Sequence, residues 1–324
     1  MNWLRHLRWP LISPKRLAEI GILGMNGRNI DFISRYNPRH CYPLVDDKLK
    51  TKLLAQQHGL STPQLRLIIQ SQHQVNHLAQ ALADLSAFVI KPARGSGGKG
   101  ITVITQRDGE QFLKASGQAL SLGDLQRHLS NILAGIYSLA GAPDIAIIED
   151  LIQPDPYFRD YSYEGVPDIR VIVFKGYPVM SMLRLSTHAS DGKANLHQGA
   201  VGVGLDIASG RAIYAVQFGR RVEQHPDTQR PLVEICPPHW STILTLAVRC
   251  QQMTGLGYLG ADIVLDAQHG PTMLELNARP GLAIQVANGC GLLPRLRHIE
   301  GLSQAHNTPH DCVNYAMQQF ATFK

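Results

Sequence analysis

The 324-residue sequence contains no long apolar run and no paired-cysteine motif. The lack of an apolar stretch near eighteen residues long argues against a transmembrane helix. Residues 1–10 combine cations with tryptophans but lack the apolar core of a signal peptide. They suit either a surface-packed helix or an anchor at a membrane surface or partner. Five scattered cysteines without a CxxC pair predict reduced thiols in the cytoplasm.

Nucleic-acid motifs are also missing, although the formal net charge is +6. The lysines and arginines form no tract, and no zinc finger, basic helix or aromatic RNA-binding motif accompanies them. Anionic small molecules drawn into a positive cleft explain the excess more simply. With 44% hydrophobic and 17% charged residues, the composition is that of an ordinary globular protein, and the length suggests about two domains.

The most informative segment is residues 259–281, LGADIVLDAQHGPTMLELNARPG. Two runs of alternating residues around Gly270 predict a hairpin, on which Asp262 can meet Glu275 and Asn277. Two carboxylates and an amide are the hard oxygen donors that Mg²⁺ prefers, and such a set leaves coordination positions open for phosphates. The alternative is a pair of edge strands with solvated carboxylates.

A glycine-rich loop lies within residues 88–105, FVIKPARGSGGKGITVIT. Glycines allow backbone amides to wrap a phosphate, and Lys91, Arg94 and Lys99 add positive charge. The β-branched run after the loop predicts a second strand and not a helix, so the loop closes a hairpin. That pattern differs from a P-loop or a Rossmann loop, each of which opens a helix. A flexible turn is the alternative.

Taken together, these features resemble the ATP-grasp superfamily, in particular the RimK-like alpha-L-glutamate ligases. The similarity runs from about Asp46 to Gly291 and rests on six segments that stand in order along the chain. They are DKLKTKLLAQQHGLSTP, FVIKPARGSGGKGI, AIIEDLI, PDIRVIVFKGYPV, MLRLSTHASDGKANLHQGA, and ADIVLD with TMLELNARPGL. The resemblance implies an α/β (α+β) ATP-grasp fold in which two α/β lobes clasp ATP.

The implied organisation has four parts. Residues 1–45 form a short N-terminal lead, 46–150 the small lobe with the glycine-rich loop, 151–300 the large lobe with the metal-binding hairpin, and 301–324 a C-terminal tail. Relatives usually carry a larger Rossmann-like domain before the clasp. The short lead is therefore a departure, and the resemblance does not say what replaces the substrate contacts of that domain.

Local patterns predict the main elements. Helices are expected over 46–58, near 73–84 and over 240–254, with two amphipathic helices within 108–140. Strands are expected at 65–69 and 144–152, and a hairpin over 166–188. Residues 190–204 are polar and glycine-rich, which is typical of a loop that could close as a lid.

The resemblance implies that ATP contacts a lysine of the first helix, the glycine loop with its lysine, and the strand beside adenine. Lys48 is favoured over Lys52 as the helix lysine, and a solvated helix face is the alternative. The residues implied at ATP are Lys48, Lys91, Arg94, Gly95, Ser96, Gly97, Gly98, Lys99, Gly100, Glu149, Asp150, Leu151 and Ile152.

The metal and substrate residues also follow from the resemblance. Asp262, Glu275 and Asn277 are implied to bind Mg²⁺, with two ions expected and Mn²⁺ as a substitute. The expected catalytic residues are Arg170, Arg184, Asn195 and Arg279. Guanidinium groups grip carboxylates and phosphates in a planar, bidentate way. The alternative for the two sheet arginines is a surface position, and His197 suits an orienting role better than metal binding.

The implied chemistry is ATP-dependent ligation of a carboxylate to an amine through an acyl phosphate. L-glutamate is the expected acid, and a peptide, a protein tail or a small amine the acceptor. Catalysis then rests on alignment and charge neutralisation and needs no protein nucleophile. Two alternatives stay open, a phosphotransferase of the same fold and a nucleotide-binding partner subunit without turnover. No nucleic-acid partner is expected, and a homo-oligomer is compatible with the sequence.

Overall fold

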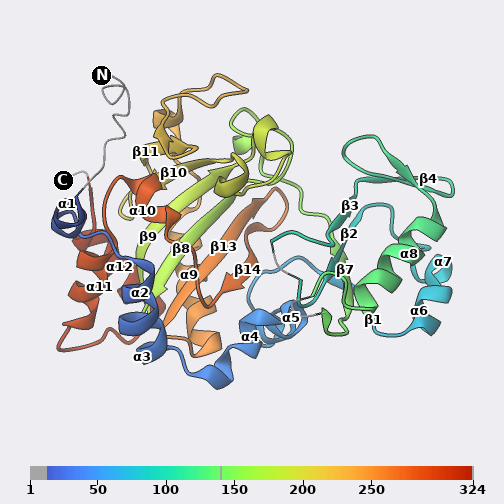
Figure 1. Ribbon diagram of the computed structural model, residues 1–324, viewed down its shortest axis with the longest axis horizontal. Helices are drawn as coiled ribbons and strands as arrows, with labels where there is room; N and C mark the ends of the chain where they lie inside the picture. Colours follow the sequence, from blue (N-terminus) through green and yellow to red (C-terminus); the bar gives the residue numbers. More distant parts are fainter. Residues whose placement is uncertain (1–12, 96, 139–140, 323–324) are drawn as a thin grey trace, which may run out of the picture.

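The computed structural model describes residues 13–95, 97–138 and 141–322, which form two lobes of unequal size (Figure 1). Residues 1–10, which suit a surface-packed helix or an anchor, and the loop residue Ser96 lie outside the described residues. Three antiparallel sheets of four, seven and three strands organise the described chain. In the described residues no helix is long and apolar enough to cross a membrane.

The small lobe is built on the four-stranded sheet. Its strands, in spatial order, are β1 (Leu65–Ile69), β7 (Ala146–Asp150), β2 (Phe88–Pro92) and β3 (Thr102–Ile104). The helices α6 (Gln72–Asn76), α7 (Leu78–Ala81) and α8 (Leu122–Leu133) belong to the same lobe. A buried apolar cluster within residues 69–148 holds these elements together. The glycine-rich loop joins β2 to β3 as antiparallel neighbours, which confirms the predicted hairpin.

The prediction of two helices within 108–140 was wrong in its first half. Residues 106–120 form the three-stranded sheet of β4 (Gln106–Asp108), β5 (Gln111–Leu113) and β6 (Ala119–Leu120), and α8 alone follows. Gly109 and Gly117 adopt positive φ at the turns between strands, and Phe112 packs edge-on against Phe88 in the lobe core. The predicted helix near 73–84 is also divided, because α6 ends at His77 before α7 begins.

The large lobe is built on the seven-stranded sheet. In spatial order its strands are β12 (Arg220–Arg221), β11 (Ala212–Gln217), β10 (Val201–Leu205), β9 (Tyr177–Leu185), β8 (Asp168–Phe174), β13 (Tyr258–Asp266) and β14 (Gly270–Asn277). The hairpins predicted over 166–188 and 259–281 are both present, as β8 with β9 and β13 with β14. β14 is the edge strand, and it faces the small lobe (Figure 1).

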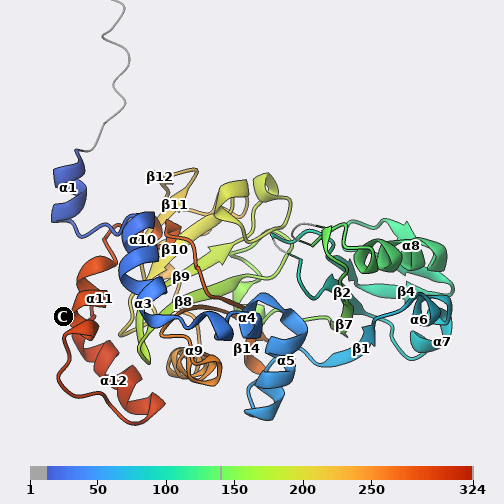
Figure 2. The same cartoon turned by 60° about the horizontal axis from the view of Figure 1, so that its bottom comes forward.

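Helices cover both faces of the large sheet (Figure 2). The helix α9 (Trp240–Thr254), which has the bounds predicted for it, packs against β13 and β14. α10 (Ala283–Asn288) lies on the other face, where Gly204 of β10 lets its backbone approach. α11 (Leu293–Glu300) and α12 (Pro309–Gln319) complete the C-terminal end, and α12 packs against β9 and α9.

The N-terminal lead packs on the large lobe and not on the small one. It comprises α1 (Pro14–Glu19), α2 (Met25–Gly27), the π-helix η2 (Arg28–Ile33), α3 (Ser34–Tyr36), the 3₁₀ turn η3 (Arg39–Cys41) and α4 (Pro43–Asp46). The Phe32 ring lies edge-on to Phe174 of β8, with ring centres 5.5 Å apart. The helix predicted over 46–58 is α5 (Lys48–Gln57), and the Asp47 carboxylate caps it by accepting two backbone N–H groups. The four-part domain division stays a prediction.

Candidate active site

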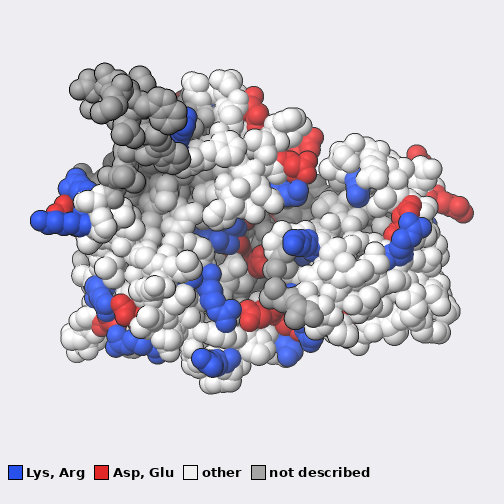
Figure 3. Space-filling model, viewed as in Figure 1, with Lys and Arg blue, Asp and Glu red and all other residues white. Residues whose placement is uncertain are grey.

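A furrow between the lobes is lined by side chains of both charges (Figure 3). Its first hollow, of about 440 Å³, lies between the strand that leaves the small lobe and the β13–β14 turn. The second is narrow and is lined by Lys48, Lys52, Lys91 and β14. The third, of about 650 Å³, joins α4, the glycine loop and the end of β14. Thr62 borders the first two hollows, and Lys48 with Glu275 the last two, so the three form one line along β14.

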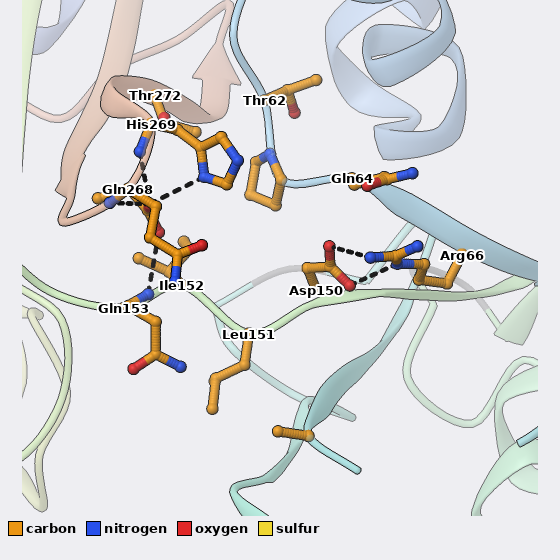
Figure 4. Close-up of a pocket in the computed structure, with 13 residues that line it drawn as sticks. Thr62, Gln64, Arg66, Asp150, Leu151, Ile152, Gln153, Gln268, His269 and Thr272 are labelled. Carbon is orange, nitrogen blue, oxygen red and sulfur yellow. Dashed lines mark hydrogen bonds and ion pairs between the residues drawn. The ribbon is translucent and has the colours of Figure 1, made fainter. Parts of the chain in front are cut away.

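The end of β7 and the residues that follow it line the first hollow (Figure 4). Asp150, Leu151 and Ile152, which the sequence places beside adenine, all line it. The carboxylate of Asp150 accepts two hydrogen bonds from the Arg66 guanidinium, at 2.6 and 2.8 Å. The hollow therefore combines backbone polar groups of a strand end with apolar walls, as a site for a planar base requires.

Asp266 ties the β13–β14 turn to the segment that leaves the small lobe. Its carboxylate accepts the backbone N–H groups of Gln153, Gln268 and His269, each at 2.9 Å, and the His269 Nδ1 lies at the same distance. Burial acts to raise the pKa of Asp266, but these donors outweigh it and hold the pKa below its usual range. The connection between the lobes is thus fixed beside the first hollow (Figure 4).

Glu149 belongs to the second hollow and not to the first. Its carboxylate forms ion pairs with Lys91 and with Lys52, the latter at 2.8 Å. Lys52 also donates to Thr62 Oγ1 at 3.0 Å and to the Pro63 carbonyl at 2.5 Å. Burial lowers the pKa of Lys52, and Glu149 opposes that effect. One buried carboxylate therefore holds two buried ammonium groups in the narrow middle of the furrow.

Lys48 connects the glycine loop to the large-lobe hairpin. Its ammonium donates to the Gly95 carbonyl at 2.6 Å and lies 3.4 Å from the Glu275 carboxylate. Asp47, which caps α5, also pairs with Arg94 Nε at 3.3 Å. A single side chain from α5 thus spans the distance between the two elements that the sequence assigns to phosphate and metal.

The rest of the glycine loop is open to solvent. Gly97, Gly98 and Lys99 are exposed, and both glycines adopt positive φ. Gly100 also has positive φ, and a Cβ at this position would lie 2.6 Å from the Tyr137 ring. The described loop residues are therefore closely packed at Gly100, where the chain re-enters the sheet, and exposed at residues 97–99.

Two arginines and two aspartates form a buried network on β8, β9 and β13. Arg170 donates two hydrogen bonds to Asp262, at 2.7 and 2.6 Å, and Arg184 donates to Asp262 at 2.7 Å while pairing bidentately with Asp168. Cross-strand register creates these pairs, because Arg170 lies opposite Asp262 and Asp168 opposite Arg184. Burial raises the pKa of Asp168 to about 6. At Asp262 burial is outweighed by the two guanidiniums, which lower its pKa.

The three predicted metal ligands share one face of the hairpin. Asp262 lies opposite Glu275, and the Asn277 amide nitrogen donates to Asp262 at 3.3 Å, which leaves the amide oxygen for a ligand. The Glu275 side chain is 41% exposed at the furrow. In the part of the chain that the structure describes, no group of three or more His, Cys, Asp or Glu side chains is arranged to hold a metal ion by itself. Two acids and an amide oxygen fit a hard cation such as Mg²⁺.

Arg279 lies just beyond β14 and lines the third hollow, with its guanidinium 4.7 Å from the centre of the Tyr42 ring. Asn195 lies in the loop between β9 and β10, where its side chain accepts the His197 N–H at 3.0 Å, and His197 itself is exposed. Neither of these two loop residues lines the three hollows. The structure thus brings Arg279 to the furrow and leaves Asn195 as the cap of a turn.

Sequence reasoning missed Asp168 and Tyr42, and it ranked Lys52 below Lys48. Both lysines lie at the second hollow, one helical turn apart. Asp168 precedes Arg170 by two residues on one strand, so a shared face could have been inferred from the period of two. Tyr42 carries no local signal, because its partner lies more than two hundred residues away.

Comparison with known proteins places these elements in a known group. The model of the family described as "Sugar-transfer associated ATP-grasp" matches residues 27–301. A probable alpha-L-glutamate ligase of Maridesulfovibrio salexigens is 36% identical over 115 residues, which cover 36% of this chain and 27% of that protein. The chain thus spans about a quarter of the length of this curated relative. The similarity to an ATP-grasp family that the sequence indicated is confirmed.

Solved structures with a similar course of the chain include the ATP-grasp ligase PsnB complexed with a minimal precursor, at 17% identity and a TM-score of 0.45, covering 87% of this chain and 63% of that one. D-alanyl-alanine synthetase A from Vibrio cholerae shows 12% identity and a TM-score of 0.48, covering 87% of this chain and 67% of that one.

Proposed function

The chain belongs to the sugar-transfer associated ATP-grasp family, and from that premise we propose that it is an ATP-dependent carboxylate–amine ligase. The observation that carries the proposal is the position of Lys48. Its ammonium contacts the glycine loop at Gly95 and the acidic hairpin at Glu275, so a triphosphate lying in the furrow would meet both. The fold implies ATP with Mg²⁺; two ions, and Mn²⁺ as a substitute, are part of the proposal.

The three hollows suggest how ATP would lie. Adenine would occupy the first hollow, against the backbone of residues 150–152. The phosphates would run past Lys48 and Lys91 in the second, and the terminal phosphate would reach the third hollow with Arg279. The second hollow is narrow, so nucleotide binding requires the lobes or these side chains to move apart. The exposed part of the glycine loop, which contains Gly97, Gly98 and Lys99, would fold over the phosphates.

Glu275, Asn277 and Asp262 would hold the Mg²⁺ ion, and the ion would neutralise charge on the phosphates. The chain's own cations do the rest. Lys91 and Arg279 would hold the phosphoryl group in line with the attacking carboxylate, because alignment and fixed charge account for most of the catalysis in phosphoryl transfer. No protein nucleophile takes part.

The acid substrate would lie over Arg170 and Arg184. Each guanidinium uses Nε and Nη2 on the aspartates, which leaves Nη1 without a partner among the described residues. Two free N–H-bearing nitrogens next to the metal ligands suit the second carboxylate of a dicarboxylic amino acid. L-glutamate is the proposed acid, and the similarity of 115 residues to a probable alpha-L-glutamate ligase supports that choice. Asn195 would join this site on closure of the loop between β9 and β10.

The reaction proceeds in two balanced steps. A carboxylate oxygen attacks the terminal phosphorus of ATP, and the bond from that phosphorus to the bridging oxygen breaks. The products of this step are ADP and an acyl phosphate. The acceptor amine then attacks the acyl carbon, inorganic phosphate leaves, and the nitrogen loses a proton as the amide forms. We propose a peptide, a protein tail or a small amine as acceptor. The family's association with sugar transfer adds amino sugars to the acceptors that an assay should contain.

The test is ADP release by the purified protein with Mg-ATP and the amino acids, alone and in pairs, with amine-bearing peptides and amino sugars as acceptors. Mass spectrometry identifies the products, and Glu275→Gln is the inactive control. An amide formed with glutamate, together with ADP and phosphate, would support the ligase. A phosphorylated product without an amide would show that the protein is a phosphotransferase and not a ligase. Nucleotide binding without turnover with any acceptor would indicate a binding subunit.

A further inference from the structure

The segment that carries Arg279 is irregular, yet its backbone is held on both sides of that residue. It follows β14 directly, and Ala278 and Pro280 flank the arginine. The Ala278 carbonyl accepts the Asn37 amide at 3.2 Å, and the Pro280 carbonyl accepts Arg28 Nη1 at 2.7 Å. Both donors come from the N-terminal lead, so the two peptide units next to Arg279 are fixed by a part of the chain that is distant in sequence.

The two donors are themselves buried and fixed. Asn37 is 4% exposed and Arg28 is 8% exposed. Asn37 also donates to the Tyr258 carbonyl and accepts the Tyr258 N–H, each at 2.8 Å, so it joins the start of β13 to the end of β14. Gly260 of β13 leaves room for the Pro280 ring, because a Cβ there would lie 2.6 Å from it. Buried polar groups with complete hydrogen bonding hold a backbone in one arrangement.

The guanidinium of Arg279 is held by a third residue of the lead. Its carbon lies 4.7 Å from the centre of the Tyr42 ring, within the range of a cation–π contact. Arg279 is exposed, and in the described residues it has no ion pair, whereas Arg94 at the same hollow pairs with Asp47. Its charge therefore stays uncompensated by an acid and is available to an anion in the third hollow.

We propose that the N-terminal lead is a positioning element for Arg279, and that Tyr42 aims this arginine at the terminal phosphate of the bound nucleotide. The inference deepens the proposed function and rests on it. A free arginine loses considerable side-chain entropy when it grips a phosphate, and a stacked, pre-oriented guanidinium loses less. The lead would thus contribute to the active site by fixing one catalytic cation.

The experiment compares Mg-dependent binding of ADP and of a non-hydrolysable ATP analogue to the full chain by titration calorimetry. The ratio of the two affinities reports on the terminal phosphate alone. We expect Arg279→Ala to abolish the preference for the triphosphate. Tyr42→Leu should reduce that preference by about twofold to thirtyfold, the range of a cation–π contact. Tyr42→Phe keeps the aromatic ring and should keep the preference of the wild type.

A matched control lies in the same lead. Tyr36 carries Arg35 over its ring at 5.4 Å, but it packs against Phe174 and does not line the third hollow. Tyr36→Leu removes an arginine–tyrosine contact of the same kind and should lower the melting temperature without changing the ratio of affinities. A general loosening of the lead would instead shift the ratio in both leucine variants.

A double variant separates positioning from independent effects. If Tyr42 acts through Arg279, Tyr42→Leu combined with Arg279→Ala should show the same ratio as Arg279→Ala alone. Equal ratios for the wild type and Tyr42→Leu, with a lower ratio for Arg279→Ala, would overturn the inference while leaving the proposed ATP site intact. Failure of the wild type to bind either nucleotide would instead overturn the proposed function.

Discussion

Replacement of Glu149 by glutamine tests the buried centre of the furrow. The carboxylate is 1% exposed and neutralises Lys52 and Lys91, which are 5% and 7% exposed. Glutamine keeps the shape and removes the charge, so two buried ammonium groups would share a site without a counter-ion. Loss of one partner from a buried ion pair costs about 3–5 kcal/mol. We therefore expect a large loss of stability from a change of one atom.

The melting temperature translates that cost into a measurable shift. At about 2.1 cal/mol/K per residue, unfolding of the chain carries an entropy near 0.7 kcal/mol/K, so the expected shift is about 4–7 °C. Scanning calorimetry at neutral pH measures it. The matched control is Asp150→Asn, because Asp150 is the next residue and pairs with Arg66 through two hydrogen bonds, but both side chains are more than a third exposed. Solvent screens an exposed pair, so the control should shift the melting temperature by about 1 °C or less.

The pH dependence gives a second readout. Burial lowers the pKa of Lys52 and Glu149 opposes this, so Glu149→Gln should lower that pKa further. Deprotonation of Lys52 then removes the uncompensated charge, and the stability deficit of the variant should shrink as the pH is raised toward the usual lysine range. Equal shifts for Glu149→Gln and Asp150→Asn would refute the reasoning, as would a deficit that grows at alkaline pH.

Three further outcomes are expected. Burial raises the pKa of Asp168 to about 6 from 3.8, so the native state binds a proton more tightly and the contribution of this residue to stability falls as the pH rises from about 4 to 6. Asp168→Asn should therefore reduce the dependence of the melting temperature on pH over that window. An unchanged dependence on pH would contradict the assignment. Gly100→Ala should weaken nucleotide binding more than Gly98→Ala in calorimetric titration, because both glycines have positive φ but only the first would clash with Tyr137; similar losses would show that conformation alone matters. Asp266→Asn should raise the KM for ATP with little effect on kcat, since the carboxylate fixes the segment beside the first hollow; a change confined to kcat would argue against this role.

The parts of the fold that sequence predicted well are those set by local patterns. The β13–β14 hairpin follows from two strand-forming runs on either side of Gly270, and the 240–254 helix is followed by Gly255, which adopts positive φ as a C-terminal cap. The small β4–β5–β6 sheet was predicted as helix, because its strands are only two or three residues long and hold together through Phe112 in the lobe core. Strands that short carry too few residues to show a period.

The site shows the same division between local and distant information. Proximity of Asp262 to Glu275 could be predicted, since both lie on one hairpin. The pairing of Arg170 with Asp262 could not, because it depends on β8 lying beside β13, and the two residues are 92 positions apart in the sequence. Asp262 was expected to bind a metal with Glu275 and Asn277, and in the structure its carboxylate also pairs with two guanidiniums. The contact between Tyr42 and Arg279 likewise depends on where the lead docks.

The central claim is that a carboxylate oxygen attacks ATP, and isotope transfer tests it most directly. Glutamate labelled with ¹⁸O in its carboxylates is incubated with the protein, Mg-ATP and the acceptor that supports turnover, and the released phosphate is analysed by mass spectrometry. The account predicts one ¹⁸O atom in each phosphate released, because the acyl oxygen leaves with the phosphoryl group. Phosphate without ¹⁸O, released alongside ADP, would show that water or another group had attacked ATP and would contradict the ligase mechanism.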